Sequence, residues 1–249
     1  YLEILMEQIV DELLDALQLT RTNLIYNGGG HFYVLAPNTT KASTTIESME
    51  RSINEWLLTV FGTKLYLALG STTATAGDLI NSQRTLFRRV SQSVGESKNK
   101  RYSEQHLTEL FNPNSTYNTV LHGERECSIC HTSTATLSPY GKDTDAEACP
   151  ICNGLYRLGE QIVDSRDTVF VLASPNTSDD NESIPKVEVY INRLSGEDKG
   201  KLYLYVVPES SLQKFESSHK ILRIYAKNTA KTGHNVFNRI WLADYVARK

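Results

Sequence analysis

The sequence predicts an α+β protein of more than one domain, and three observations support this. Amphipathic helical patterns alternate with short β-rich runs, hydrophobic residues make up 40% of the 249 positions, and all four cysteines lie near the middle of the chain. This hydrophobic content, with 22% charged residues, is that of an ordinary globular protein. A chain of this length can bury one large core or two smaller ones, and the central cysteines favour two or three domains.

The first hundred residues follow a helix, hairpin, helix, strand order. The helix patterns place apolar residues on one stripe, and the strand patterns alternate. Thr44 and Glu47 have capping-box spacing at the start of the second helix. The expected elements are a helix over 1–18, strands over 24–26 and 32–35, a helix over 43–61, a strand over 64–71 and a helix over 78–94. This order is most of the ferredoxin-like pattern of cyclase and polymerase palms, and its missing opening strand would precede Tyr1.

The hairpin has a bare glycine tip, Gly28, Gly29 and Gly30, followed by His31. Cyclase and polymerase palms usually carry acids at this hairpin, where they bind two metal ions. With no carboxylate at the turn, we expect this palm to be catalytically inert on its own. Its glycines allow backbone N–H groups to approach a phosphate closely, although a plain flexible turn explains them equally well. We expect His31 to be an ordinary strand residue.

The four cysteines form two Cys-x-x-Cys pairs, Cys127 with Cys130 and Cys149 with Cys152. Two such knuckles at this separation are typical of a four-thiolate zinc site, which is structural because no coordination position stays open. Two disulfides, one redox pair, or four unrelated buried cysteines are the alternatives. Two histidines, His122 and His131, flank the first knuckle and are expected to be bystanders. A helix opening near Leu155 would complete a treble-clef-like site.

Beyond the cysteine segment the pattern changes to strands, rich in β-branched and aromatic residues. A short helix is expected over 103–111, before the cysteines. The expected later elements are strands over 168–173, 186–192, 201–207 and 221–225, and a closing helix over 236–247.

Charge is unevenly distributed, although the net charge is only −3. Arg84 to Arg101 carries six basic residues and one acid, a balance of +5, and Lys214 to Lys249 carries eight and two, a balance of +6. The net charge argues against coating of nucleic acid by bulk electrostatics. Either basic stretch fits a phosphate backbone, an acidic partner or a plain solvated helix face.

Three features together resemble the large subunit of type III CRISPR effector complexes, of the Csm type. They are Asn23 to Asn38 with its glycine hairpin, the paired Cys-x-x-Cys motifs, and Asn235 to Tyr245 with its Ile-Trp-Leu-Ala-Asp-Tyr ending. The likeness spans essentially the whole chain. In that family an HD-type nuclease domain precedes a first palm with a Gly-Gly-Gly hairpin, a zinc-bearing linker domain, a second palm with Gly-Gly-Asp-Asp, and a helical tail.

The resemblance implies a division of the chain and a largely non-catalytic role. It implies a glycine-hairpin palm over 1–103, a linker over 104–125, a four-cysteine zinc domain over 126–165, and an α+β segment over 166–249 leading toward the second palm. The family cleaves single-stranded DNA with its HD domain and makes cyclic oligoadenylates from ATP between its palms. This chain contains neither an HD-type His-Asp pair nor Gly-Gly-Asp-Asp.

By resemblance, therefore, Gly28, Gly29 and Gly30 would lie near ATP, with divalent metal ions supplied only by the second palm. The implied partners are other subunits of the effector complex and, indirectly, guide RNA and target RNA, for which the basic stretches are candidate contacts. The same resemblance implies antiviral defence as the biological setting.

A second interpretation, from another functional class, is a zinc-stabilised interaction module in a different nucleotide-signalling or RNA-associated assembly. Oligoadenylate synthesis that requires an added acidic palm would separate the two interpretations. A lone diguanylate-cyclase-like enzyme would need hairpin acids that this chain lacks. We expect a cytoplasmic protein, because no signal peptide and no membrane-spanning apolar run is visible.

Overall fold

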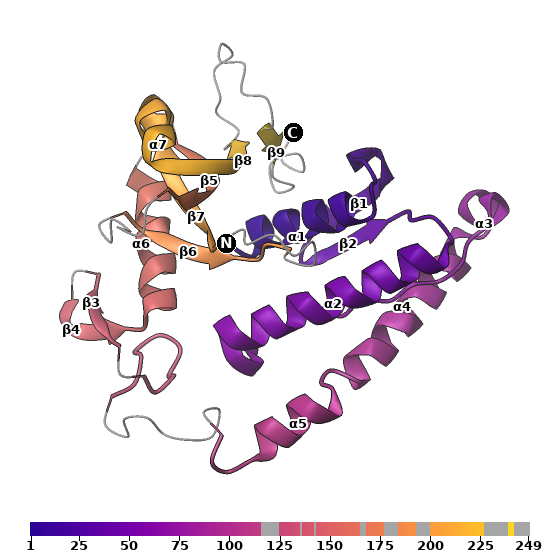
Figure 1. Ribbon diagram of the computed structural model, residues 1–249, viewed down its shortest axis with the longest axis horizontal. Coiled ribbons are helices and arrows are strands. Elements are labelled where there is room, and N and C mark those ends of the chain that lie inside the picture. The colour runs from indigo at the N-terminus through magenta and orange to yellow at the C-terminus, as the bar shows by residue number, and fades with distance from the viewer. Residues whose placement is uncertain are drawn as a thin grey trace. The chain divides into compact units, whose positions relative to one another are not determined.

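The computed structural model describes residues 1–115, 125–134, 136–141, 143–164, 168–176, 184–192, 200–226 and 239–241 (Figure 1). The chain folds into two compact units. One contains residues 1–12, 21–34 and 120–249, and the other contains residues 13–20 and 35–119. Within the described residues, none of the helices has the length and apolar character needed to cross a membrane. The mixture of helices and sheets confirms the predicted α+β class.

A five-stranded sheet organises the first unit. Its strand order is β6-β7-β5-β8-β9, antiparallel except for the parallel pair β8 and β9. The strands are β5 (Thr168–Pro175), β6 (Lys186–Val189), β7 (Leu202–Pro208), β8 (His219–Ala226) and β9 (Arg239–Trp241). Central strand β5 is buried over its first six residues, so both faces of the sheet are covered there. The four strands predicted between residues 168 and 225 are confirmed, although β6 ends at Val189 and not at residue 192.

The predicted closing helix is wrong where the structure describes it. Arg239–Trp241 forms strand β9, which pairs with Ile224 to Ala226 of β8. The remainder of 236–247 lies outside the described residues. A short run around Ile240 and Trp241 satisfies helical and strand patterns alike, and the free edge of β8 supplies the backbone partners that decide between them.

Two helices pack on this sheet. One is α7 (Leu212–Ser218), which follows the turn η3 (Glu209–Ser211) and places Phe215 in a core with Val171, Tyr205 and Ile224. His219 stacks on Phe215, with ring centroids 3.9 Å apart. The other is α6 (Pro150–Asp164), which packs against β6 and β7. Neither α7 nor the start of α6 at Pro150 was predicted.

Helix α1 (Leu2–Ala16) confirms the first predicted helix, but its burial differs from a single apolar stripe. Polar residues between the leucines are also buried: Glu7, Gln8, Asp11 and Glu12 are each at most 7% exposed. Arg223 of β8 donates to Gln8 Oε1 at 2.6 Å and to Glu12 Oε1 at 3.0 Å. Its Nε also lies 3.3 Å from Asp11 Oδ2. A helical pattern alone cannot reveal a partner more than two hundred positions away.

A second arginine and two backbone groups complete this buried network. Arg21, from the short turn η1 (Arg21–Asn23), pairs with Glu7 at 2.7 Å and with Asp11 at 2.6 Å. Gln8 donates to the carbonyl of Tyr190, and the Asn192 N–H donates to Glu12. Burial raises the pKa of Asp11, and the two guanidinium groups only partly oppose that rise. The first helix is thereby attached to the sheet by directional bonds.

The second unit is built on α2 (Thr40–Phe61), whose buried stripe includes Met49, Ile53 and Leu57. The helix begins earlier than predicted, because Thr39 caps it and accepts a bond from the Ala42 N–H at 3.2 Å. The predicted capping box at Thr44 and Glu47 is therefore wrong. Thr44 instead donates to carbonyls of the preceding turn.

The predicted strand over 64–71 is also wrong. Residues 62–64 form the turn η2, and 65–71 pair with no strand among the described residues. Side chains of α2 take over the role of a neighbouring strand: Asn54 bonds both the N–H and the carbonyl of Leu67, and Glu50 accepts from the Leu69 N–H at 3.0 Å. The alternating leucines fit a strand pattern, but the hydrogen-bond partners of this segment are helix side chains.

Three further helices complete this unit: α3 (Ala76–Asn81), α4 (Gln83–Asn99) and α5 (Glu104–Phe111). The single helix predicted over 78–94 is interrupted at Ser82 and extends five residues further. Thr75 and Asp78 form a complete capping box at the start of α3. Ser103 caps α5, which confirms the prediction for 103–111.

A substitution at Gly154 tests how closely α6 packs on the sheet. A Cβ at this position would lie 2.7 Å from the Lys186 carbonyl oxygen of β6, whereas Gly159 of the same helix has open space. Gly154→Ala is expected to lower the free energy of unfolding by roughly 1–3 kcal/mol through overpacking. Gly159→Ala should raise it by about 0.5–1 kcal/mol, from helix propensity. Denaturant unfolding measures both, and equal effects of the two substitutions would contradict this packing.

Arg223 tests the buried network. Its side chain is only 14% exposed, and Arg223→Met leaves Glu12 buried without a guanidinium and Asp11 with only that of Arg21. The expected loss is about 3–5 kcal/mol of unfolding free energy. The control is Lys220→Met on the same strand, an exposed position where a change within about 0.5 kcal/mol is expected. Matching denaturation midpoints for the two variants would show that Arg223 is dispensable.

Candidate metal centre and glycine hairpin

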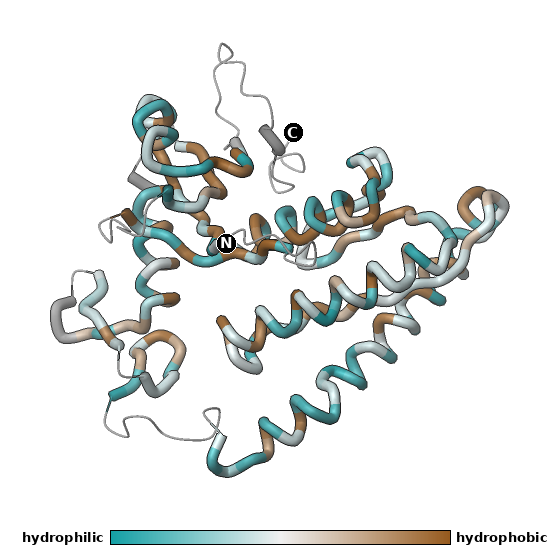
Figure 2. Tube along the Cα trace, in the orientation of Figure 1, coloured by the Kyte–Doolittle hydropathy of each residue, from teal (hydrophilic) through white to brown (hydrophobic). Residues whose placement is uncertain are grey.

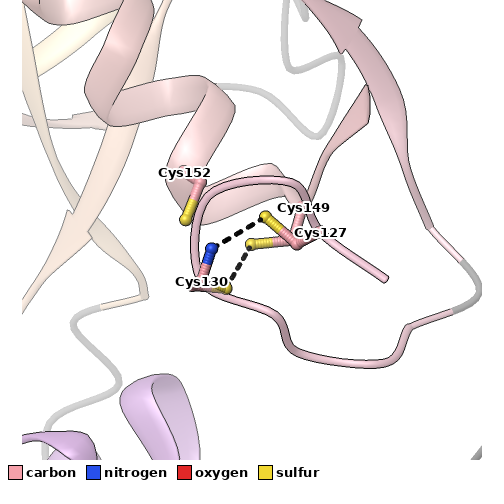
Figure 3. Close-up of side chains that lie close together, drawn as sticks. All are labelled: Cys127, Cys130, Cys149 and Cys152. Carbon is pink, nitrogen blue, oxygen red and sulfur yellow. Dashed lines mark hydrogen bonds between the residues drawn. The ribbon is translucent and has the colours of Figure 1, made fainter. Parts of the chain in front are cut away.

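The four cysteines converge on one point (Figure 3). Their Sγ atoms all lie within 4.8 Å of one another, and those of Cys130 and Cys149 are 3.8 Å apart. Four sulfurs at the corners of a tetrahedron, each about 2.3 Å from a zinc ion, lie about 3.8 Å from each other. Cys127 is fully buried and Cys149 nearly so. The cluster therefore has the size and the donors of a tetrahedral thiolate site.

Local backbone structure builds each knuckle. In the first, the His131 N–H donates to the Cys127 carbonyl at 2.9 Å, and His131 takes a positive φ of 56° to close the turn. The Cys130 N–H points to Cys127 Sγ at 3.5 Å. The second knuckle is the start of α6, so Cys152 lies in the first helical turn, and the Asn153 N–H donates to the Cys149 carbonyl.

A small hairpin joins the two knuckles and was not predicted. It pairs β3 (Ser138–Tyr140) with β4 (Asp143–Ala148), which leads directly into Cys149. The Ser128 N–H donates to the Glu147 carbonyl, which ties the first knuckle to β4. Leu137, Tyr140 and Ile151 pack around the cysteines as a local apolar shell.

The thiols differ in acidity. Burial alone raises the pKa of Cys130, but hydrogen bonds with Thr132, Cys127 and Cys152 lower it to about 6. Burial also opposes ionisation of Cys127, yet backbone N–H groups of the knuckles hold its pKa below the ordinary value. For Cys149 and Cys152, burial and the neighbouring sulfurs raise the pKa. Four thiolates this close repel one another, and a divalent cation among them would remove that repulsion.

The structure removes some alternatives for the cysteines. All four are free thiols, and the 3.8 Å separation of Cys130 and Cys149 is far longer than the roughly 2.0 Å of a disulfide bond. They are also not unrelated, because all four meet at one point. His131 is exposed and stands outside the cluster, and His122 lies outside the described residues. Thr132 was not singled out from the sequence.

The glycine hairpin pairs β1 (Leu24–Gly28) with β2 (His31–Val34) and confirms the predicted hairpin. Gly28 lies opposite His31, so Gly29 and Gly30 form a two-residue turn with φ of 58° and 75°. Two positive φ values are the signature of a type I′ turn, which by itself requires glycine-like residues. A Cβ at Gly29 or Gly30 would have nothing within 4 Å, so the tip is open.

His31 and the nearby apolar and aromatic residues make up the exposed surface around this tip. The exposed His31 ring contacts the Gly29 carbonyl through Nδ1 at 3.0 Å. Ile25 and Tyr26 are each about half exposed, and the rings of Tyr26 and Tyr33 lie 6.3 Å apart. The tip presents backbone groups and apolar surface, and its four residues, 28–31, include no carboxylate.

Comparison with known proteins identifies the family. Residues 1–115 match the family model described as Csm1 subunit domain B. Over 263 residues the chain is 34% identical to a protein of Mycobacterium tuberculosis described as the CRISPR system single-strand-specific deoxyribonuclease Cas10/Csm1 (subtype III-A), a match covering 100% of this chain and 30% of that protein. The chain belongs to the Csm1 family. The resemblance identified from the glycine hairpin and paired cysteines is confirmed.

Other Csm1 proteins support the assignment. The Enterococcus italicus protein of the same description is 33% identical over 248 residues, covering 98% of this chain and 29% of the relative. The chain thus spans less than a third of the length of these Csm1 relatives. A crystal structure described as a Csm1-Csm4 cassette in complex with one ATP is 33% identical, covering 41% of this chain and 15% of that chain, with a TM-score of 0.39.

Cys149→Ser tests the metal centre. We expect the wild-type chain to hold about one ion, and the variant to lose it and melt roughly 10 °C or more lower, because structural Zn²⁺ contributes about 10 kcal/mol to folding. Cys127→Ser should behave alike. Ser128→Ala, which keeps every sulfur in the same knuckle, is the control. Elemental analysis and thermal melts measure the outcome, and unchanged metal content and melting in both cysteine variants would rule the site out.

Proposed function

We propose that this chain is the non-catalytic palm and zinc-stabilised scaffold portion of the large subunit of a type III-A CRISPR effector complex. The observation that carries the proposal is that the whole chain aligns with part of two proteins described as Cas10/Csm1 deoxyribonucleases. Their nuclease activity requires catalytic residues, and this chain has no HD-type His-Asp pair. We therefore attribute strand cleavage to parts of the subunit outside this chain.

The proposed division follows the sequence motifs: a palm-like domain over 1–103, a linker over 104–125, a zinc domain over 126–165 and an α+β segment over 166–249. The family-model match covers residues 1–115, that is, the proposed palm-like domain and the first part of the proposed linker. Because Gly154 of α6 packs directly on β6, the metal centre and the sheet of the α+β segment would behave as one mechanical piece.

The proposed metal is zinc, and its role is structural. Zinc prefers four tetrahedral thiolates, and a closed Cys₄ shell has no position for a water or substrate. Cys127, Cys130, Cys149 and Cys152 would hold the ion, and Thr132 would stabilise the Cys130 thiolate. When bound, the ion supplies charge neutralisation and a fixed angle between the two knuckles. These residues perform no chemistry on a substrate.

The glycine hairpin is proposed as a secondary nucleotide site. A triphosphate needs backbone N–H donors and close approach, and the turn at Gly29 and Gly30 has no side chain to obstruct either. Gly28 is the last residue of β1 and directly precedes this turn. ATP and its divalent metal ions would bind productively only when the acidic second palm is present, since carboxylates must hold the metals.

The proposed partners are the other subunits of the effector complex and, indirectly, guide RNA and target RNA. A chain with net charge −3 contacts RNA through local basic surfaces and not through overall charge. A cytoplasmic location belongs to the same proposal.

Gly29→Asn tests the nucleotide role without breaking the turn. Asn tolerates the positive φ of a type I′ turn, so the hairpin should fold while a side chain now fills the open tip. In the full-length subunit with ATP and Mg²⁺, oligoadenylate synthesis is expected to fall roughly 10- to 100-fold, as for a misplaced reacting group. The reaction is followed by chromatography of the products.

Gly200→Asn is the control, since Gly200 also has a positive φ, of 64°, and open space around its Cβ direction. Its synthesis rate should equal that of the unaltered protein. Equal rates for Gly29→Asn and Gly200→Asn would refute a nucleotide role for the hairpin. Synthesis by this chain without any acidic palm would refute the non-catalytic assignment.

A further inference from the structure

We propose that the exposed basic stripe of α4, formed by Arg84, Arg88 and Lys98, binds the phosphate backbone of single-stranded DNA. The inference rests on the proposed function for its choice of ligand, and on the structure of α4 for the surface. Figure 2 shows that α4 carries mostly hydrophilic residues along its length.

The stripe follows from helical spacing. Positions 84, 88, 91, 95 and 98 are separated by four, three, four and three residues, so they share one face of α4. Arg84, Arg88 and Lys98 are all exposed, and Ser91 and Gly95 lie between them. At 1.5 Å per residue the cations span about 21 Å of the helix axis. The small residues between them leave room for a backbone to lie close along the helix.

Two other basic residues of this stretch, Arg89 and Arg101, are already engaged, which distinguishes the stripe from them. Arg89 pairs with Asp78 at 3.5 Å. Arg101 donates to the Thr63 carbonyl at 2.6 Å and packs over the rings of Tyr66 and Tyr102. By contrast, no ion pair joins the stripe residues to a carboxylate anywhere in the part of the chain that the structure describes.

Acidic residues are kept off this face. The one acid within α4 is Glu96, about 120° around the helix from Arg84. In a chain whose net charge is −3, a line of cations with no acid between them is a local exception. Such a surface complements a polyanion, and association through it releases counterions.

Two features favour a single strand over a duplex or an acidic peptide. One line of cations on one helix face matches one line of phosphates. At the C-terminal end of α4, the aromatic pair Tyr66 and Tyr102 is only partly buried, with ring centroids 6.1 Å apart, and Arg101 is fixed beside it. Unstacked bases bind such aromatic and guanidinium surfaces, which paired bases of a duplex cannot reach. Among single strands, the proposed membership of a single-strand-specific deoxyribonuclease selects DNA.

The test uses the intact subunit that contains this chain and a fluorescent oligothymidylate as the probe. Each phosphate contact to a single strand contributes about 0.7 to the slope of log affinity against log salt concentration. The variant Arg84→Gln/Arg88→Gln/Lys98→Gln is therefore expected to flatten the slope by about 2. Because all three residues are exposed, the variant should melt like the unaltered protein.

The control removes the same charge from exposed positions elsewhere, as Lys41→Gln/Arg51→Gln/Lys220→Gln. Its slope should stay unchanged. As a local readout, oligothymidylate should protect Lys98 from acetylation in mass spectrometry, and leave Lys41 reactive.

Equal slopes for the two triple variants, or no protection of Lys98, would overturn the inference. So would a stripe variant that loses single-stranded RNA or polyglutamate binding while its DNA binding is unchanged. A failure of the proposed function is seen separately, in the metal content of Cys149→Ser and the oligoadenylate synthesis of Gly29→Asn, because neither variant alters a residue of α4.

Discussion

The convergence of four cysteine sulfurs is the constraint on which the cysteine segment of the first unit depends. As thiolates, sulfurs within 4.8 Å of one another repel, and the proposed zinc ion would neutralise that repulsion. The second knuckle is also the start of α6, and α6 packs on β6 so closely that Gly154 has no room for a side chain. Under the proposed function, coordination at one end of the helix would therefore fix the position of the sheet at its side. A closed Cys₄ shell would give this link rigidity without reactivity.

A second set of charged residues attaches the first helix to the same sheet through buried ion pairs and hydrogen bonds. Buried ion pairs are weak evidence for stability, since removing charges from water costs nearly as much as pairing them returns. These pairs matter because they are directional. Arg223 contacts Gln8, Asp11 and Glu12 in one geometry, and a shifted helix would leave carboxylates unpaired. The network thus specifies where α1 lies, whereas apolar contacts alone tolerate sliding.

The sequence predicted features whose cause is local and missed those whose cause is distant. Cysteine spacing identified the four-sulfur cluster, and alternation identified β5 to β8, because a period or a spacing is visible in a single chain. The segment over 64–71 looked like a strand, but Asn54 and Glu50 supply its hydrogen bonds. Residues 239–241 were predicted to be helical, but they form a strand that pairs with the edge of β8. The buried acids of α1 have their partner on β8, and no local pattern contains that information.

The glycine hairpin shows why the shape that a motif gives the backbone and the chemistry it can perform must be considered separately. A type I′ turn needs two residues with positive φ, so Gly29 and Gly30 are explained by the turn before any ligand is considered. The turn type does not require open space around the two glycines, yet a Cβ at either position would have no atom within 4 Å. An open tip without carboxylates can donate backbone N–H groups but cannot hold metal ions. Under the proposed function, this chain therefore contributes shape and phosphate contacts, and the charge that drives nucleotide chemistry comes from the second palm.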